Sequence, residues 1–128
     1  MTPVYERAEF TVEPAPAARG GSTMVMAVND VEPPRRPYRQ TCPYNTFVAI
    51  IRWIDVDAGR MFTEHELAKD AGLPFTAVHV AITFLIERGI LDKRTRRAPI
   101  TALTDDVYAD GMTEWHAALH KTLKGQST

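Results

Sequence analysis

The sequence has only one cysteine, no long apolar run and almost no net charge, and each shortage excludes a class of proteins. Because Cys42 stands alone, the chain can form neither an intramolecular disulfide nor a cluster of thiolates around zinc. No stretch is apolar for long enough to span a bilayer, and no basic region leads into an apolar run at the N-terminus. We therefore expect a cytoplasmic protein without a signal peptide. A formal net charge of −1 also argues against a protein that coats nucleic acid through overall positive charge.

Residues that could form a catalytic or metal site are also missing. We find no arrangement of Ser, His and Asp, no Cys–His pair, no paired carboxylates and no glycine-rich phosphate loop. His116 and His120 have the i, i+4 spacing of some metal ligands, but the glutamate of the zinc-protease motif is absent and no third ligand is evident. We expect a protein that is not an enzyme and that has no metal, no cofactor and no small-molecule ligand.

Proline dominates the first forty residues, and we predict that residues 1–40 form a largely disordered N-terminal tail. Seven of the nine prolines lie in the first third of the chain, and proline removes a backbone donor and disfavours helix in the residue before it. One exception is the segment 23–28, TMVMAV, whose strand-like composition could add an edge strand. A basic segment at the end of the tail is either a linker or an extended arm for a DNA minor groove, and it contains Arg35, Arg36 and Arg39.

Helical patterns begin after residue 40. Apolar residues at i, i+3, i+4 and i+7 predict a first helix over residues 41–57, with Thr41 as its N-cap. These apolar residues are Phe47, Ile50, Ile51 and Ile54. Thr63 and Glu66 form a capping box, in which each side chain bonds the backbone amide of the other residue, and this box predicts the start of a second helix. Gly72 suits the left-handed conformation that ends such a helix.

The rest of the pattern predicts one more helix, a short hairpin and a final helix. A third helix over residues 74–88 follows a tight turn, and two strands over residues 90–92 and 100–103 flank a loop at 93–99. The last helix covers residues 105–124, with acidic residues at its start and lysines at its end, which matches the helix dipole.

This order of elements resembles the winged helix-turn-helix superfamily of DNA-binding proteins. The matching residues are Glu66-Leu67-Ala68, Ala71-Gly72-Leu73, Val78 and Leu85-x-x-x-Gly89-Ile90-Leu91. The resemblance implies a mainly α protein with a small β-hairpin: a winged helix-turn-helix domain over residues 41–104, with a three-helix core and a two- or three-stranded wing, and an extra C-terminal helix in residues 105–128. It also implies binding of double-stranded DNA, as in bacterial and phage transcriptional regulators.

By this resemblance, the exposed face of the third helix would enter the major groove. Its residues are Phe75, Thr76, His79, Val80 and Thr83. The threonines and the histidine can hydrogen-bond to base edges or phosphates, while Phe75 or Val80 could contact a thymine methyl group. Helices that read bases more commonly carry Arg, Ser, Gln or Asn on this face. The alternative is therefore a surface that binds a protein or is covered by the tail.

The strongest separation of charge lies at the predicted wing. Within ten residues the sequence has five bases and one acid, namely Arg88, Lys93, Arg94, Arg96 and Arg97 with Asp92. We expect the four bases from Lys93 to Arg97 to contact phosphates and to make DNA binding strongly dependent on salt. The alternative is a solvated charged loop.

The last helix allows two interpretations. Tyr108, Met112, Trp115 and Leu119 form its apolar face, which either completes the core against the first helix or forms the seam of a homodimer that binds paired half-sites. Gly111 weakens this helix by roughly 1 kcal/mol but permits another backbone to approach closely.

Two rival functions would use the same fold. A winged helix can serve as a protein–protein interaction module, here with Phe75 and Val80 as anchors, or as an accessory DNA-binding factor in plasmid or phage replication. A steep salt dependence of duplex binding would distinguish DNA binding from the protein-interaction module.

Overall fold

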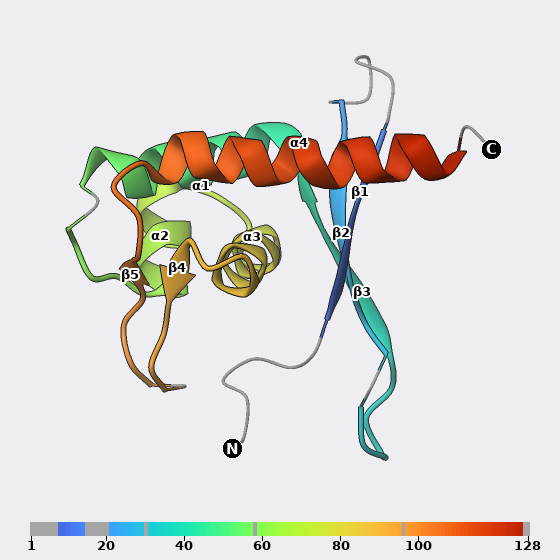
Figure 1. Ribbon diagram of the computed structural model, residues 1–128. Coiled ribbons are helices and arrows are strands. Elements are labelled where there is room, and N and C mark those ends of the chain that lie inside the picture. Colours follow the sequence, from blue (N-terminus) through green and yellow to red (C-terminus); the bar gives the residue numbers. More distant parts are fainter. Residues whose placement is uncertain (1–7, 15–20, 30, 58, 96, 127–128) are drawn as a thin grey trace.

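In the computed structural model, the described residues form four helices and two antiparallel sheets (Figure 1). The structure describes residues 8–14, 21–29, 31–57, 59–95 and 97–126. The fold is mixed α/β and not mainly α, because the N-terminal part adds a three-stranded sheet. The arrangement of the helices and the hairpin is compatible with a winged helix. None of the described helices is both long and apolar enough to cross a membrane.

The N-terminal sheet contains β1 (Glu9–Glu13), β2 (Thr23–Val28) and β3 (Tyr38–Pro43), which pair antiparallel in that order. The prediction of a largely disordered tail over residues 1–40 is therefore wrong for the described part of that segment, and β2 is the central strand and not an edge strand. The described prolines of this segment lie between strands or at the last position of β3, where a missing amide donor does little harm.

Side chains alternate across this sheet, as they do in a sheet with one buried face. The inner face is buried and includes Val12, Met24, Met26, Val28 and Cys42. On the outer face, the register places Thr11 and Thr41 on either side of Val25, and both threonines are exposed. The sheet therefore turns an apolar side toward the helices and a polar side toward solvent.

The helices and the hairpin lie close to their predicted positions. They are α1 (Tyr44–Val56), α2 (Glu64–Ala71), α3 (Phe75–Glu87), β4 (Leu91–Asp92), β5 (Thr101–Ala102) and α4 (Val107–Gln126). Each helix boundary agrees with its prediction within three residues. The prediction of Thr41 as the first N-cap is wrong, because its backbone pairs with Val25 in the sheet, and Pro43 precedes α1 without a side-chain cap.

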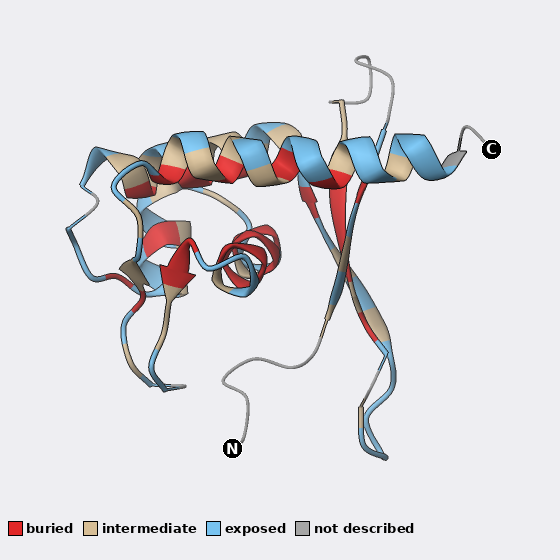
Figure 2. Ribbon diagram, in the orientation of Figure 1, coloured by how far each residue is buried: buried red, intermediate tan, exposed pale blue. Residues whose placement is uncertain are grey.

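Aromatic contacts join the N-terminal sheet to the helices. The rings of Phe10 in β1 and Phe84 in α3 lie 5.4 Å apart, and the rings of Phe47 in α1 and Trp115 in α4 lie 4.6 Å apart. Trp115 Nε1 also donates a hydrogen bond to Ser22 Oγ at 3.2 Å. Strands and helices share one hydrophobic core, and Figure 2 shows its buried parts on α3, on the strands and on one side of α4.

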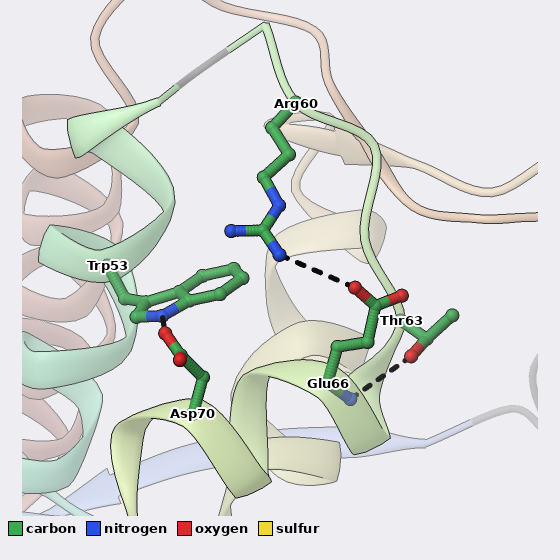
Figure 3. A network of polar contacts seen from close by, with 5 residues as sticks. All are labelled: Trp53, Arg60, Thr63, Glu66 and Asp70. Carbon is green, nitrogen blue, oxygen red and sulfur yellow. Dashed lines mark hydrogen bonds and ion pairs between the residues drawn. The ribbon is translucent and has the colours of Figure 1, made fainter.

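α2 begins and ends as the sequence predicts. The Thr63 hydroxyl accepts a hydrogen bond from the Glu66 amide at 3.1 Å, and Gly72 has the left-handed conformation, with φ of 67°. Only this half of the capping box forms, because the Glu66 carboxylate lies 3.5 Å from Arg60 Nη2 instead of at the Thr63 amide (Figure 3).

A second group of contacts in this region joins α1 to α2. Trp53 Nε1 donates a hydrogen bond to Asp70 Oδ2 at 2.6 Å, and the Arg60 guanidinium lies 5.0 Å from the centre of the Trp53 ring (Figure 3). A cation over an indole face is attracted by the ring quadrupole. These contacts hold α2, and with it the turn into α3, against α1.

α4 packs on α1 and on β1. Trp115 is fully buried in this contact. Half-buried against the same core are Tyr108, Met112 and Leu119. Gly111 permits the close approach, because a Cβ at this position would lie 3.0 Å from Ile51 Cγ2 in α1. The apolar face of α4 therefore packs on the core of its own chain.

Candidate nucleic-acid interface

α3 lies between the other helices and the N-terminal sheet, with α1 and α2 on one side and β2 and β3 on the other. Val78, Ile82 and Leu85 are buried, as predicted. On the sheet side, Phe84 is buried as well and packs against the ring of Phe10. Figure 2 shows that most of the circumference of α3 is buried.

Two residues predicted to contact DNA are buried instead. Val80 has no exposed surface, and Thr83 is only 5% exposed. The Thr83 hydroxyl donates a hydrogen bond to the backbone carbonyl of His79 at 2.7 Å, so this hydroxyl is used within α3. The cause is the N-terminal sheet, which covers a side of α3 that would otherwise face solvent. For these two residues the structure agrees with the alternative prediction, in which the N-terminal segment covers this face of α3.

The N-terminal end of α3 stays open to solvent. Phe75 is 42% exposed, Thr76 is exposed, and the His79 side chain keeps 27% of its surface exposed. The three residues lie within one helical turn of each other, so they share one side of α3. They are the members of the predicted face that remain accessible at this end of α3.

Two residues of α2 extend this open end. The ring of His65 stacks on the ring of Phe75, with 4.4 Å between centroids and an angle of 14°. Glu64 Oε1 lies 2.9 Å from His79 Nδ1, and the Glu64 side chain is only 11% exposed. Neither residue was predicted as part of the site. The available signal was the capping box, which places both residues in the first turn of α2.

β4 and β5 pair antiparallel in a short hairpin at the position predicted for the wing, and we call this hairpin with its loop the wing. An isolated bridge between Phe62 and Ile100 adds the start of a third strand, and β4 contacts α3. The loop between the two strands extends away from α4, beyond the body of the molecule (Figure 1).

The bases of the wing differ in exposure. Arg94 and Arg97 are exposed, Lys93 is half-buried, and Arg96 lies outside the described residues. These residues follow β4 directly, so the short hairpin carries the charge at its tip.

Arg88, which precedes the wing in the sequence, lies against the body of the protein. Its Nε atom is 3.8 Å from a carboxylate oxygen of Glu87 and 4.0 Å from one of Glu114. Its guanidinium is also 5.1 Å from the centre of the Phe84 ring. Because two acids offset its charge, Arg88 contributes little to the positive charge of the wing.

The three arginines predicted as an arm belong to the hairpin formed by β2 and β3. Arg35 and Arg36 are exposed in the connection, and Arg39 lies in β3, where its Nη2 is 3.8 Å from Glu13 Oε1. Neither alternative for this segment, a linker or an extended arm, describes it, because paired strands hold both of its ends. Contact of these arginines with a minor groove stays a prediction. This hairpin and the wing extend on the same side of the molecule, away from α4 (Figure 1).

Two other features were candidates for a site and do not form one. A cavity of about 390 Å³ is lined by two bases and two acids whose charges offset each other, namely Arg60, Lys69, Glu66 and Asp70. Burial raises the pKa of the Cys42 thiol to about 12, so this thiol is protonated at neutral pH and is a poor nucleophile. Among the described residues, no group of three His, Cys, Asp or Glu side chains could hold a metal ion.

Comparison with protein-family models, curated proteins and solved structures finds no match to this chain.

Proposed function

We propose that this chain binds double-stranded DNA as a winged helix-turn-helix protein and acts in transcriptional regulation. In this proposal the wing contacts phosphates, and the open N-terminal end of α3 enters the major groove. The observation that carries it is the exposure of Arg94 and Arg97 on a hairpin that projects from the body and contacts α3.

The distribution of charge supports this proposal, although the net charge is −1. The loop of the wing, KRTRRAP over residues 93–99, contains no acid. The two acids in the first turn of α2 both have side-chain partners: Glu66 lies 3.5 Å from the Arg60 guanidinium, and Glu64 lies 2.9 Å from the imidazole of His79. A phosphate that approaches this side would meet the positive wing and acids whose charge is partly offset.

In this proposal few side chains of α3 contact bases. Because Val80 and Thr83 are buried, only Phe75, Thr76 and His79 of the predicted face are accessible for direct contacts to bases. A good pair of hydrogen bonds to a base contributes about 1–3 kcal/mol of discrimination. We therefore expect a modest sequence preference, with a large share of the affinity from phosphates.

Protein–protein interaction is a second candidate function, and one observation favours it. Phe75 is 42% exposed and stacks on His65, and an accessible aromatic pair of this kind is typical of an interface anchor. An accessory role in replication would instead use the same DNA contacts as the first proposal.

Duplex binding measured against salt concentration tests the proposal. We expect the affinity for a duplex of about thirty base pairs, roughly three helical turns, to fall more than tenfold between about 50 and 200 mM salt. Arg94→Ala combined with Arg97→Ala should reduce the slope of log affinity against log salt by about two. The control pair, Lys121→Ala with Lys124→Ala, removes the same charge from α4. It should leave the slope unchanged, because α4 lies on the opposite side of the molecule from the tip of the wing (Figure 1).

Two results would contradict this proposal. Absence of binding to any duplex at the low end of the salt range would refute DNA binding and favour a protein partner anchored on Phe75. If the arginine and the lysine double variants reduced the slope of log affinity against log salt equally, the DNA would be attracted by the overall positive charge, and the wing would have no specific role. Thr76→Ala should relax the sequence preference and leave the slope unchanged, because a base contact releases no counterion.

A further inference from the structure

Two segments of the chain are joined to each other at one end of the molecule. The segment that follows α1 contacts the segment that leads into α4 through backbone hydrogen bonds between Phe62 and Ile100, at 3.1 and 2.7 Å. Farther along both segments, the amide of Tyr108 donates a hydrogen bond to Asp55 Oδ1 at 3.4 Å. The described parts of the two segments therefore share one surface, at the left end of Figure 1, where α1 ends and α4 begins.

This surface carries apolar side chains that are open to solvent. Val56 is 88% exposed, Met61 is 62% exposed and Leu103 is 58% exposed, and these are three of the five large apolar side chains that are exposed in the described part of the chain. The backbone holds Leu103 in place, because its amide donates a hydrogen bond to the carbonyl of Ile90 at 2.8 Å. Single exposed apolar side chains are common, but several on one surface are typical of a place where another molecule binds.

Four carboxylates share the surface with these apolar side chains. They are Asp55, which is half-buried, and Asp57, Asp105 and Asp106, which are exposed. Two arginines nearby lie over aromatic rings, with Arg60 at 5.0 Å from the centre of the Trp53 ring and Arg52 at 5.3 Å from that of Tyr108. Arg60 is also turned toward Glu66 of α2 (Figure 3). We call this region the acidic apolar surface, and its carboxylates would repel the phosphates of DNA.

We propose that the acidic apolar surface docks a segment of a partner protein in which apolar side chains lie between lysines and arginines. Protein interfaces typically have an apolar centre and a polar rim. The apolar side chains would supply most of the affinity, and the carboxylates would select a basic partner and speed its association. Because the loop of the wing extends away from α4, a partner docked here leaves Arg94 and Arg97 accessible (Figure 1). This proposal does not depend on DNA binding.

Binding of a synthetic peptide to the full chain tests the proposal. The probe is an amphipathic helix with leucine at i, i+3, i+4 and i+7 and lysine at the other positions, and the control probe has glutamate in place of lysine. We expect the lysine peptide to bind at low salt and the glutamate peptide not to bind. In NMR spectra of the methyl groups, the lysine peptide should shift the signals of Val56, Met61 and Leu103 most.

Two pairs of substitutions separate the apolar contacts from the charges. Met61→Ser with Leu103→Ser should weaken binding of the lysine peptide by about fivefold or more, because the centre of the interface is lost. Asp57→Asn with Asp105→Asn should weaken it by roughly threefold to tenfold, mainly through slower association, and should reduce its salt dependence. All four side chains are exposed, so neither pair should unfold the protein, which thermal melting checks.

Matched controls lie elsewhere on the molecule. Leu123→Ser removes an exposed leucine near the other end of α4, and Glu9→Gln with Glu32→Gln removes two exposed carboxylates from β1 and from the connection between β2 and β3. Neither control should change the affinity for the lysine peptide. Met61→Ser with Leu103→Ser should also leave the affinity for a DNA duplex unchanged, because the net charge stays the same.

Several outcomes would overturn the proposal. One is the absence of peptide binding at low salt, and another is an equal loss of affinity in the test and control variants, which would show attraction without a defined surface. Self-association of the free chain that Met61→Ser with Leu103→Ser abolishes would assign the surface to a second copy. A loss of duplex affinity in the same pair would assign it to DNA. Failure of peptide binding leaves the proposed function intact, since the salt slope of the wing variant tests that function separately.

Discussion

Replacement of Gly111 by alanine measures how closely α4 packs on α1. A Cβ at this position would lie 3.0 Å from Ile51 Cγ2, 3.4 Å from Ile51 Cδ1 and 3.6 Å from Leu85 Cδ2. Non-bonded carbon atoms are most favourable at about 3.5–4.0 Å. Neither Ile51 nor Leu85 has any exposed surface, so neither side chain can yield by moving into solvent.

Two terms of opposite sign decide the effect of Gly111→Ala on the free energy of unfolding. Alanine is favoured over glycine inside a helix by about 1 kcal/mol. An extra methyl group in a packed core costs about 1–3 kcal/mol, because neighbouring side chains leave their preferred positions. We expect a net destabilisation of about 1 kcal/mol, which lowers Tm by roughly 3–5 °C for a chain of this size. Gly125→Ala in the same helix, where a Cβ would meet nothing within 4 Å, should be neutral or slightly stabilising.

Chemical denaturation of two single variants and their double variant is the assay. Ile51→Ala alone should destabilise the protein by roughly 2–5 kcal/mol, because it leaves a cavity. In that background the crowded atoms are gone and the new methyl group fills part of the cavity, so Gly111→Ala should become stabilising. The two substitutions should therefore show an interaction energy of about 1–3 kcal/mol.

Two results would refute this reasoning. Stabilisation of the original chain by Gly111→Ala, to the degree seen for a helix position exposed to solvent, would show that α4 does not pack on α1. An effect that depends on protein concentration would instead place the close contact between two copies, as in a dimer seam.

Two further predictions concern the cap of α2 and the buried thiol. Thr63→Ala should lower the free energy of unfolding by about 1 kcal/mol, because the amide of Glu66 loses its acceptor, whereas Thr63→Ser should lose only a few tenths in the same denaturant titration. Burial raises the pKa of Cys42 from 9.0 to about 12, so the unfolded chain loses this proton first as pH rises. The free energy of unfolding should therefore fall between about pH 9 and 12, and Cys42→Ala should remove this component when unfolding is measured across the same range. An identical pH dependence in Cys42→Ala would contradict the assignment of the slope to this thiol.

Local signals in the sequence predicted the elements that depend on short-range interactions. The hydrogen bond from the Glu66 amide to Thr63 spans three residues, and the left-handed Gly72 closes α2 within one turn. The bounds of α3 and the two strands of the wing follow from periodicity and from turn residues in the same way. The position of Arg94 and Arg97 in the loop after β4 therefore follows from the sequence alone.

The N-terminal sheet was missed because its pairing is not local. β2 pairs with β3 across a connection that contains three prolines, and the composition of such a segment predicts disorder. The burial of the strands depends on α3 and α4, since Phe10 packs on Phe84 and Trp115 bonds Ser22. Neither strand composition nor proline content carries this information.

The composition of α3 indicates that this helix is buried on more than one side. Besides the stripe of Val78, Ile82 and Leu85, the helix carries Val80 and Phe84 on another side, and a helix that is apolar on most sides is a buried helix. What covers that second side is decided by chain segments distant in sequence. The sequence by itself determined where helices begin, where they end and where the wing carries its charge, because backbone hydrogen bonds and side-chain periodicity act within a few residues. Only the tertiary structure decided which part of α3 stays accessible and that Glu64 holds His79, because burial and hydrogen-bond geometry arise from contacts between separate elements.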